Sequence, residues 1–245
     1  MLAPLRRLIT ALLILAALPA RFDAQRAPIG DAIKDFVSVD APVVALTNAR
    51  VIDGTGAPAR EGYTLVLRDG LIAAMGPTAS TPPPSGARVI DLTGKSVLPG
   101  LVMVHEHLFY PTGPGVYGQL GQSFARLYLA GGVTTMRTGG NMNGFMDFTL
   151  VKRVEAGEVA GPAIDATAPY VNGPNPFVQM TALTTPGAAT RHVDYWADAG
   201  ATSFKACMQR GALGGDGVQA GRGLRLAEAH SVGVRARRNL VNELC

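Results

Sequence analysis

Four short apolar runs recur along the chain after Gly100 and begin near residues 101, 133, 163 and 203. The first three are followed by stretches with helical patterning, over residues 123–130, 147–156 and 188–199. This interval, 30 to 40 residues, is the size of one βα unit. Repeated βα units with largely uncharged strands predict an α/β fold in which helices cover a parallel sheet. A closed barrel and an open doubly wound sheet both satisfy this spacing.

An earlier segment has the short strands and turns of a small all-β module. Its predicted strands cover residues 43–52, 63–68, 71–75, 88–91 and 96–98. Asp69 and Gly70 separate two of them and predict a two-residue hairpin, because a type I′ turn needs positive φ at both positions. We therefore expect four regions after the N-terminus: a linker over 25–42, the β module over 43–99, an α/β segment over 100–208 and a Gly-, Arg- and Ala-rich tail over 209–245.

The N-terminus has the pattern of an export signal. Arg6 and Arg7 precede an apolar run from Leu8 to Leu18, and small residues follow it. This order predicts a signal peptide over residues 1–24 and an exported protein, periplasmic or secreted. The run is short for a stable membrane span, and an uncleaved anchor is the alternative. With two cysteines in the chain, no disulfide framework is expected.

Composition and charge narrow the class of protein. Apolar residues make up 47% of the chain and charged residues 16%, which predicts a packed core. The net charge of +4 comes from the two ends of the chain. The segment between them has no basic stripe with interleaved aromatic residues, so nucleic-acid binding is not expected.

Two of the four histidines, His105 and His107, lie at the end of the first predicted strand of the α/β segment. Side chains two apart on a strand share a face, so both imidazoles are expected on one side and Glu106 on the other. In a barrel this strand end is the rim at which active sites are built. Two neutral imidazoles fixed there are half of a ligand set for zinc or a similar divalent ion. The alternative is a pair of solvated or core histidines.

Three segments together resemble the amidohydrolase superfamily: residues 45–75, residues 97–108 with the sequence VLPGLVMVHEHL, and residues 131–140 with the sequence GGVTTMRTGG. The resemblance is strongest to the imidazolonepropionase and Xaa-Pro dipeptidase-like branch. It implies a (β/α)8 TIM-type barrel, of which residues 100–208 would form about the first four to five βα units, with an N-terminal β-sandwich-like module. It also implies that a metal-activated water hydrolyses C–N bonds in amides, cyclic amides or dipeptides.

The same resemblance matches Lys205 to the family's fourth-strand lysine, which is carboxylated and bridges two metals. It therefore implies one or two divalent ions, zinc above all, held by His105, His107 and Lys205. A lysine in a low-dielectric interior has a depressed pKa, and its neutral amine can take up carbon dioxide. The alternative is a lysine whose amine reaches solvent beyond the strand end.

Two further residues are candidates for binding a small-molecule or dipeptide substrate. Arg137, at the end of the second strand, could bind a carboxylate in a bidentate fork or serve equally well as a structural ion-pair partner. Tyr170 follows the third strand, where βα loops line the pocket of a barrel.

Other parts of the family's site have no counterpart in this sequence. The resemblance calls for histidines on the fifth and sixth strands and an aspartate on the eighth, and Asn239 occupies the position expected for the fifth-strand ligand. The general base is therefore unknown, and we expect a C-terminally truncated or frame-disrupted product. An open half-barrel would expose a strand edge and favour homo-oligomers. The alternative function is a non-catalytic exported binding module derived from an amidohydrolase.

Overall fold

The computed structural model describes residues 28–173, 176, 180–206 and 243–244, which fall into two compact units. The predicted signal peptide and nearly all of the predicted tail lie outside the described residues. So do Cys207 and Met208, the last residues of the fourth predicted strand. In the described part of the chain no helix is both long and apolar enough to cross a bilayer.

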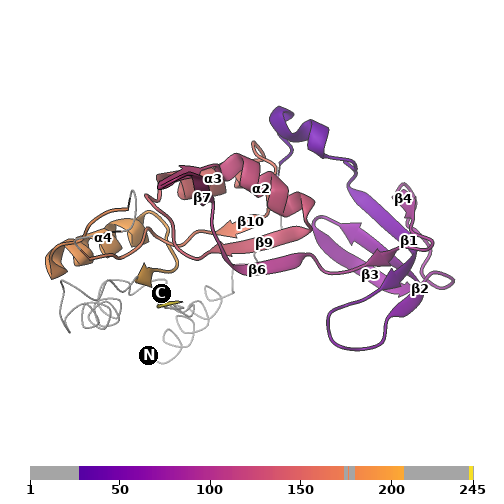
Figure 1. Ribbon diagram of the computed structural model, residues 1–245. Helices are drawn as coiled ribbons and strands as arrows, with labels where there is room; N and C mark the ends of the chain where they lie inside the picture. The colour runs from indigo at the N-terminus through magenta and orange to yellow at the C-terminus, as the bar shows by residue number, and fades with distance from the viewer. Residues whose placement is uncertain (1–27, 174–175, 177–179, 207–242, 245) are drawn as a thin grey trace, which may run out of the picture. The chain divides into compact units, whose positions relative to one another are not determined.

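The first unit is a five-stranded sheet over the predicted β module (Figure 1). Its strands are β1 (Val43–Val51), β2 (Arg60–Arg68), β3 (Leu71–Pro77), β4 (Arg88–Asp91) and β5 (Ser96–Val97). The order is β3-β2-β1-β4 with β5 also paired to β1, and the β1–β2 and β2–β3 pairs are antiparallel. Ala49, Val51 and Leu65 form its core. The predicted hairpin is confirmed, because Asp69 and Gly70 have φ angles of 52° and 76°.

The second unit contains the predicted parallel sheet. Its strands are β6 (Leu101–Glu106), β9 (Val133–Thr138) and β10 (Ala163–Asp165), in the order β10-β9-β6 and all parallel. The fourth predicted strand follows the segment after β10, since the Ala168 and Val171 amides donate to the Ser203 and Lys205 carbonyls at 3.0 and 2.9 Å. Its regular part is β11 (Lys205–Ala206), which pairs in parallel with β12 (Glu243–Leu244). The mixed α/β class is thereby confirmed.

Helices cover one face of this sheet. Figure 1 shows α2 (Gly121–Ala130) and α3 (Phe145–Glu155) on the same side of β6 and β9. Their apolar residues pack with the strands in one core, whose buried members are Leu108, Ala125, Val133, Met136, Leu150 and Val159. On β6, by contrast, Val102 and Val104 are 63% and 67% exposed. A parallel sheet is ordinarily covered on both faces, whereas this side of β6 is largely exposed in the described part of the chain.

The predicted helix over 188–199 is α4 (Pro186–Asp198). Its Thr185 N-cap accepts a hydrogen bond from the Ala188 amide, and Pro186 occupies the first turn, where a missing N–H costs nothing. Val193 and Trp196 bury its apolar side against Ala168 and Phe204. The helix therefore packs directly against the residues that lead into the fourth strand.

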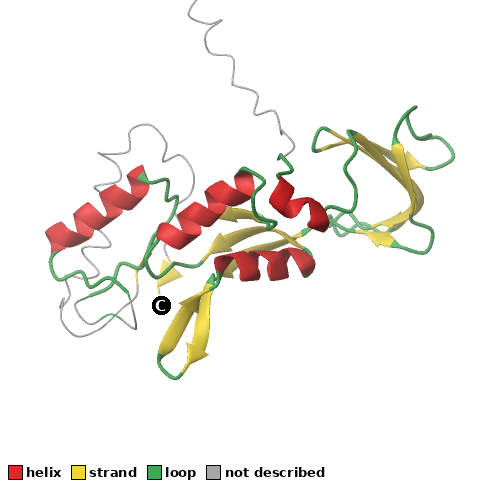
Figure 2. Cartoon of the chain, turned by 90° about the horizontal axis from the view of Figure 1, so that it is seen from above, coloured by secondary structure: helices red, strands yellow, loops and turns green. Residues whose placement is uncertain are grey.

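Four elements were not predicted: β7, β8, the 3₁₀ helix η1, and β12. The residues after β6 were expected to form a loop, but they form the hairpin of β7 (Phe109–Gly113) and β8 (Val116–Gln119), which projects as a two-stranded ribbon in Figure 2. The predicted linker contains a 3₁₀ helix, η1 (Asp31–Phe36), whose Phe36 ring lies 4.7 Å below the Arg126 guanidinium. The hairpin and η1 depend on contacts with residues distant in sequence, which local patterning does not report.

Candidate metal centre

The two histidines of the H-x-H sequence lie together at the carboxyl end of β6. Their ring centroids are 5.3 Å apart in an edge-to-face arrangement. Glu106 lies on the opposite side, because its carboxylate accepts a hydrogen bond from Tyr128 of α2, on the helix-covered face. The expected alternation is therefore confirmed, although the pairing of β6 with β9 shifts register between Met103 and Glu106.

Lys205 reaches the same place from the fourth strand. Its Nζ lies 3.1 Å from Nε2 of His105 and 5.7 Å above the ring of Tyr170. The residue is only 6% exposed, which contradicts the alternative of an amine that reaches solvent. The two nitrogens are within hydrogen-bond distance, and the tautomer of His105 determines which of them donates.

His107 is held in one tautomer by the backbone of the neighbouring strand. Its Nδ1 lies 3.3 Å from the carbonyl oxygen of Gly140. A carbonyl accepts hydrogen bonds and cannot donate them, so Nδ1 carries the proton and Nε2 is left with its lone pair. Burial lowers the pKa of His107, and the nearby positive charge of Lys205 acts in the same direction. The imidazole is therefore neutral at neutral pH, which is the metal-binding form.

The tandem glycines after β9 make room for this cluster. A Cβ at Gly139 would overlap the His105 ring, and a Cβ at Gly140 would lie 2.8 Å from the Tyr170 ring. Gly140 also has a φ of 95°, which side chains rarely adopt. These two positions therefore need glycine because the imidazole and the phenol approach the backbone closely.

A buried polar network places the fourth strand beside the third. The Thr167 amide donates to Oγ1 of Thr138 at 2.9 Å, and the Thr167 hydroxyl lies 2.8 Å from Oγ of Ser203. Asn141 adds a bond from Nδ2 to the Thr167 carbonyl at 2.6 Å. Ser203 lies two residues before Lys205, so this network determines where the lysine enters the cluster.

The donor set fits a divalent transition-metal ion. At a Zn–N distance of about 2.0–2.1 Å and tetrahedral angles, two imidazole ligands of one ion have ring centroids about 5 Å apart. The separation of 5.3 Å between His105 and His107 agrees with that geometry. In the described part of the chain no three or more His, Cys, Asp or Glu side chains cluster as a metal site would require. The described residues thus supply two imidazole donors and the amine of Lys205.

The two predicted substrate-binding residues lie near the cluster in different environments. Arg137 donates from Nε to Oγ of Ser203 at 3.3 Å and from Nη1 to the carbonyl of Val104 at 3.4 Å. These contacts join β9 to Val104 on β6 and to Ser203, two residues before β11. Tyr170 is 5% exposed, and its ring centroid lies 6.5 Å from that of His107. Tyr170 is therefore a buried neighbour of His107.

Sequence reasoning did not single out Tyr128, whose hydroxyl contacts the strand end that carries both histidines. Its position on an amphipathic helix gave no sign of this contact.

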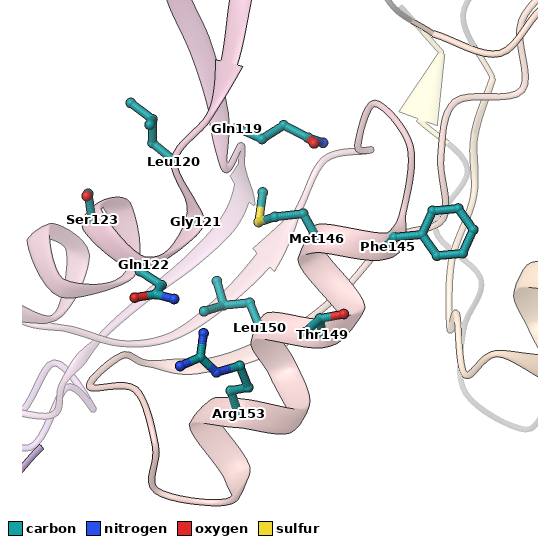
Figure 3. Close-up of a pocket in the computed structure, with 10 residues that line it drawn as sticks. All are labelled: Gln119, Leu120, Gly121, Gln122, Ser123, Phe145, Met146, Thr149, Leu150 and Arg153. Carbon is teal, nitrogen blue, oxygen red and sulfur yellow. The ribbon is translucent and has the colours of Figure 1, made fainter. Parts of the chain in front are cut away.

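A separate cavity of about 520 Å³ lies between α2 and α3 (Figure 3). Its lining includes neither histidine nor Lys205 and consists of Gln119, Leu120, Gly121, Gln122, Ser123, Phe145, Met146, Thr149, Leu150 and Arg153.

Comparison with known proteins gives three informative similarities. The chain is 42% identical over 71 residues to an N-acyl-D-aspartate deacylase from Alcaligenes xylosoxydans xylosoxydans, which covers 28% of this chain and 14% of that protein. It is 37% identical over 84 residues to an enamidase from Eubacterium barkeri, covering 34% and 21% of the two chains. Among solved structures, a candidate prolidase from Bifidobacterium longum matches with a TM-score of 0.62 and 26% identity, over 82% of this chain and 49% of that one.

No protein-family model matches the chain. The chain spans less than a quarter of the length of the two curated relatives and about half of the solved structure. The shared fold and the sequence identity to these hydrolases together support a place for this chain in the amidohydrolase superfamily.

Proposed function

We propose that this chain carries the N-terminal part of the metal centre of a hydrolase that cleaves C–N bonds. The names of the relatives, a deacylase, an enamidase and a prolidase, indicate this class of reaction. The observation that carries the proposal is the convergence of His105, His107 and Lys205 at one end of a parallel sheet. The imidazole centroids are 5.3 Å apart, and the amine lies 3.1 Å from one of the rings.

In this proposal His105 and His107 bind the metal through Nε2. His107 is already oriented for this by its Nδ1 contact with Gly140. Such second partners fix the tautomer and ring direction of metal-binding histidines. The ion, which we propose to be zinc, would polarise the scissile carbonyl and lower the pKa of the attacking water.

Lys205 is proposed to be the carboxylated ligand. Its amine is buried beside the His105 ring. A carbamate forms when the neutral amine nitrogen adds to carbon dioxide and one proton leaves. Starting from the ammonium form, two protons leave in all, one before the addition and one with it, so one positive charge becomes one negative charge. The carbamate would present two oxygens to one or two cations. This change also removes a buried ammonium group, which is costly in a low-dielectric site.

We propose that the sheet of the second unit is part of a TIM-type barrel and that the first unit belongs to a β-sandwich. The exposed apolar residues of β6, Val102 and Val104, support the barrel, since its interior would cover them. Successive parallel neighbours, β6, β9, β10 and the run through Lys205, agree with the strand order of a barrel. The described residues contain no identified general base, and the substrate is proposed to be a small amide or dipeptide. An exported location is likewise proposed, from the pattern of residues 1–24.

Metal content tests the proposal. The full 245-residue chain, purified with zinc and dialysed, is expected to retain about one or two equivalents by plasma mass spectrometry. The double variant H105A/H107A should lose this metal. The matched control is H192A, since His192 lies on α4 with Nε2 3.2 Å from the Pro169 carbonyl, and it should retain the metal. Absence of stoichiometric metal from the unsubstituted chain would favour a non-catalytic binding module.

Lysine carboxylation has its own measurement. With ¹³C-labelled bicarbonate, the zinc-loaded chain should give a carbamate carbon resonance. K205R should lose that resonance and keep its circular dichroism spectrum. If the resonance persists in K205R, another amine is carboxylated.

A further inference from the structure

On the helix-covered face of β6, the side chains of Tyr110, Tyr128 and Glu106 form a chain of hydrogen bonds. The Tyr128 hydroxyl lies 2.6 Å from Oε2 of Glu106 and 2.9 Å from the Tyr110 hydroxyl. It also lies 3.4 Å from the carbonyl oxygen of His107. These groups come from α2, the end of β6 and β7, so one hydroxyl joins three separate elements.

The direction of these bonds follows from the number of protons available. An ionised carboxylate only accepts, so Tyr128 donates its single proton to Glu106 and accepts from the hydroxyl of Tyr110. A separation of 2.6 Å is within the short range expected of a hydroxyl bonded to a carboxylate. Burial and the bond to Glu106 raise the pKa of Tyr128, so the phenol keeps its proton.

These bonds attach to the carboxyl end of β6, where the pairing with the neighbouring strand β9 is irregular. The pairing of β6 with β9 is regular at Met103 and resumes only at Glu106, so Val104 and His105 lie in an irregular stretch. The Gly139 amide fixes the backbone at Glu106, donating to its carbonyl at 2.7 Å. Tyr128 holds the same residue from the helix side through its carboxylate. Glu106, which lies between the two histidines in sequence, is thus held both at its backbone and at its side chain.

We propose that Tyr128 is a positioning residue that orients the H-x-H strand end for metal binding, acting through Glu106. This inference rests on the proposed function, in which His105 and His107 are metal ligands. Partners one step removed from metal ligands typically change metal affinity 10- to 100-fold when they are removed. Tyr128 would act in this way through the backbone of β6, with Glu106 as its link.

The first test compares metal affinity in the full chain by chelator competition with Co²⁺, whose visible spectrum also reports ligand geometry. Y128F removes the hydroxyl and keeps the ring, and it should weaken Co²⁺ binding about 10-fold and alter the cobalt spectrum. Y195F is the matched control, because Tyr195 on α4 is 55% exposed, and it should leave both unchanged. E106Q keeps an acceptor for Tyr128 and should bind within about 3-fold of the unsubstituted chain, whereas E106A should lose as much as Y128F. The double variant Y128F/E106A should lose no more than either single one.

The second test needs no metal. In ¹⁵N-histidine spectra of the metal-free chain, Y128F should shift or broaden the ring signals of His105 and His107 and leave those of His192 in place. Metal affinity and ring spectra unchanged in Y128F would overturn the role of Tyr128 while the proposed function stands. Changed ring spectra in a chain that binds no metal would uphold the positioning role and overturn the proposed function. If Y128F does not fold, E106A compared with E106Q decides, and equal affinities in those two would overturn the inference.

Discussion

Asp147, in the first turn of α3, is a buried carboxyl group whose ionisation opposes folding. The residue is 1% exposed, and neither of its carboxylate oxygens has a hydrogen-bond partner among the residues that the structure describes. Desolvation by burial raises its pKa from 3.8 to about 7. A position near a helix N-terminus favours a negative charge, but here the loss of hydration is the larger effect.

The sign of the resulting pH dependence follows from the two pKa values. Below pH 4 the carboxyl is protonated in both states, so its ionisation makes no contribution to the free energy of unfolding. Between pH 4 and 7 the unfolded chain loses this proton and the folded chain keeps it, so the free energy of unfolding falls by about 1.4 kcal/mol per pH unit. Above about pH 7, the folded-state pKa of Asp147, both states are ionised, and the accumulated loss levels off at about 4 kcal/mol.

D147N tests this reasoning because it removes the ionisation and nearly preserves the shape. We expect its urea unfolding, followed by the fluorescence of the single tryptophan, Trp196, to show a weaker fall in stability between pH 4 and 7 than the unsubstituted chain shows. Trp196 is a local probe, since its ring stacks on Phe148, the next residue of α3, at 5.4 Å. At pH 8 D147N should be the more stable protein, by up to about 4 kcal/mol. The matched control D194N, at an exposed position of α4, should follow the unsubstituted chain. Identical pH profiles for D147N and the unsubstituted chain would refute the argument.

Three further substitutions have defined outcomes. G139A should displace the His105 ring and weaken zinc binding about 10-fold in a chelator titration, and unaltered affinity would show that the ring moves aside without cost. T185A should lower the free energy of unfolding by about 1 kcal/mol, because the hydroxyl accepts from the Ala188 amide at 3.2 Å, and chemical denaturation measures this loss. G187A should raise the free energy of unfolding by about 0.5–1 kcal/mol, because the added Cβ meets only the end of the Arg191 side chain at 3.6 Å. A lower melting temperature for G187A would contradict this. G187A also serves as the zinc-binding control for G139A.

The strands of both units were predictable because their signals are local. An apolar run of strand length bounded by glycine and proline identified β6 and β9, and Asp69-Gly70 identified the turn between β2 and β3. Alternation along a strand also predicted that Glu106 faces away from its two histidine neighbours, which the bond to Tyr128 confirms. The hairpin of β7 and β8 was missed because its first strand contains a proline and ends in a glycine. Packing of Phe109 with Tyr170, 61 positions later, stabilises it, and no local pattern reports that contact.

The sequence alone determined the repeated strand–helix order, the parallel sheet that follows from it, and the presence of two imidazoles on one face of one strand. Only the tertiary structure decided that Lys205 lies 3.1 Å from His105 and that Arg137 bonds across the sheet to Ser203. It also decided that Asp147 is buried with no hydrogen-bond partner in the described part of the chain. The physical reason is the separation in sequence between the residues that interact. Secondary structure follows from the periodicity of neighbouring residues, whereas burial and contacts between residues 100 positions apart depend on how the elements pack.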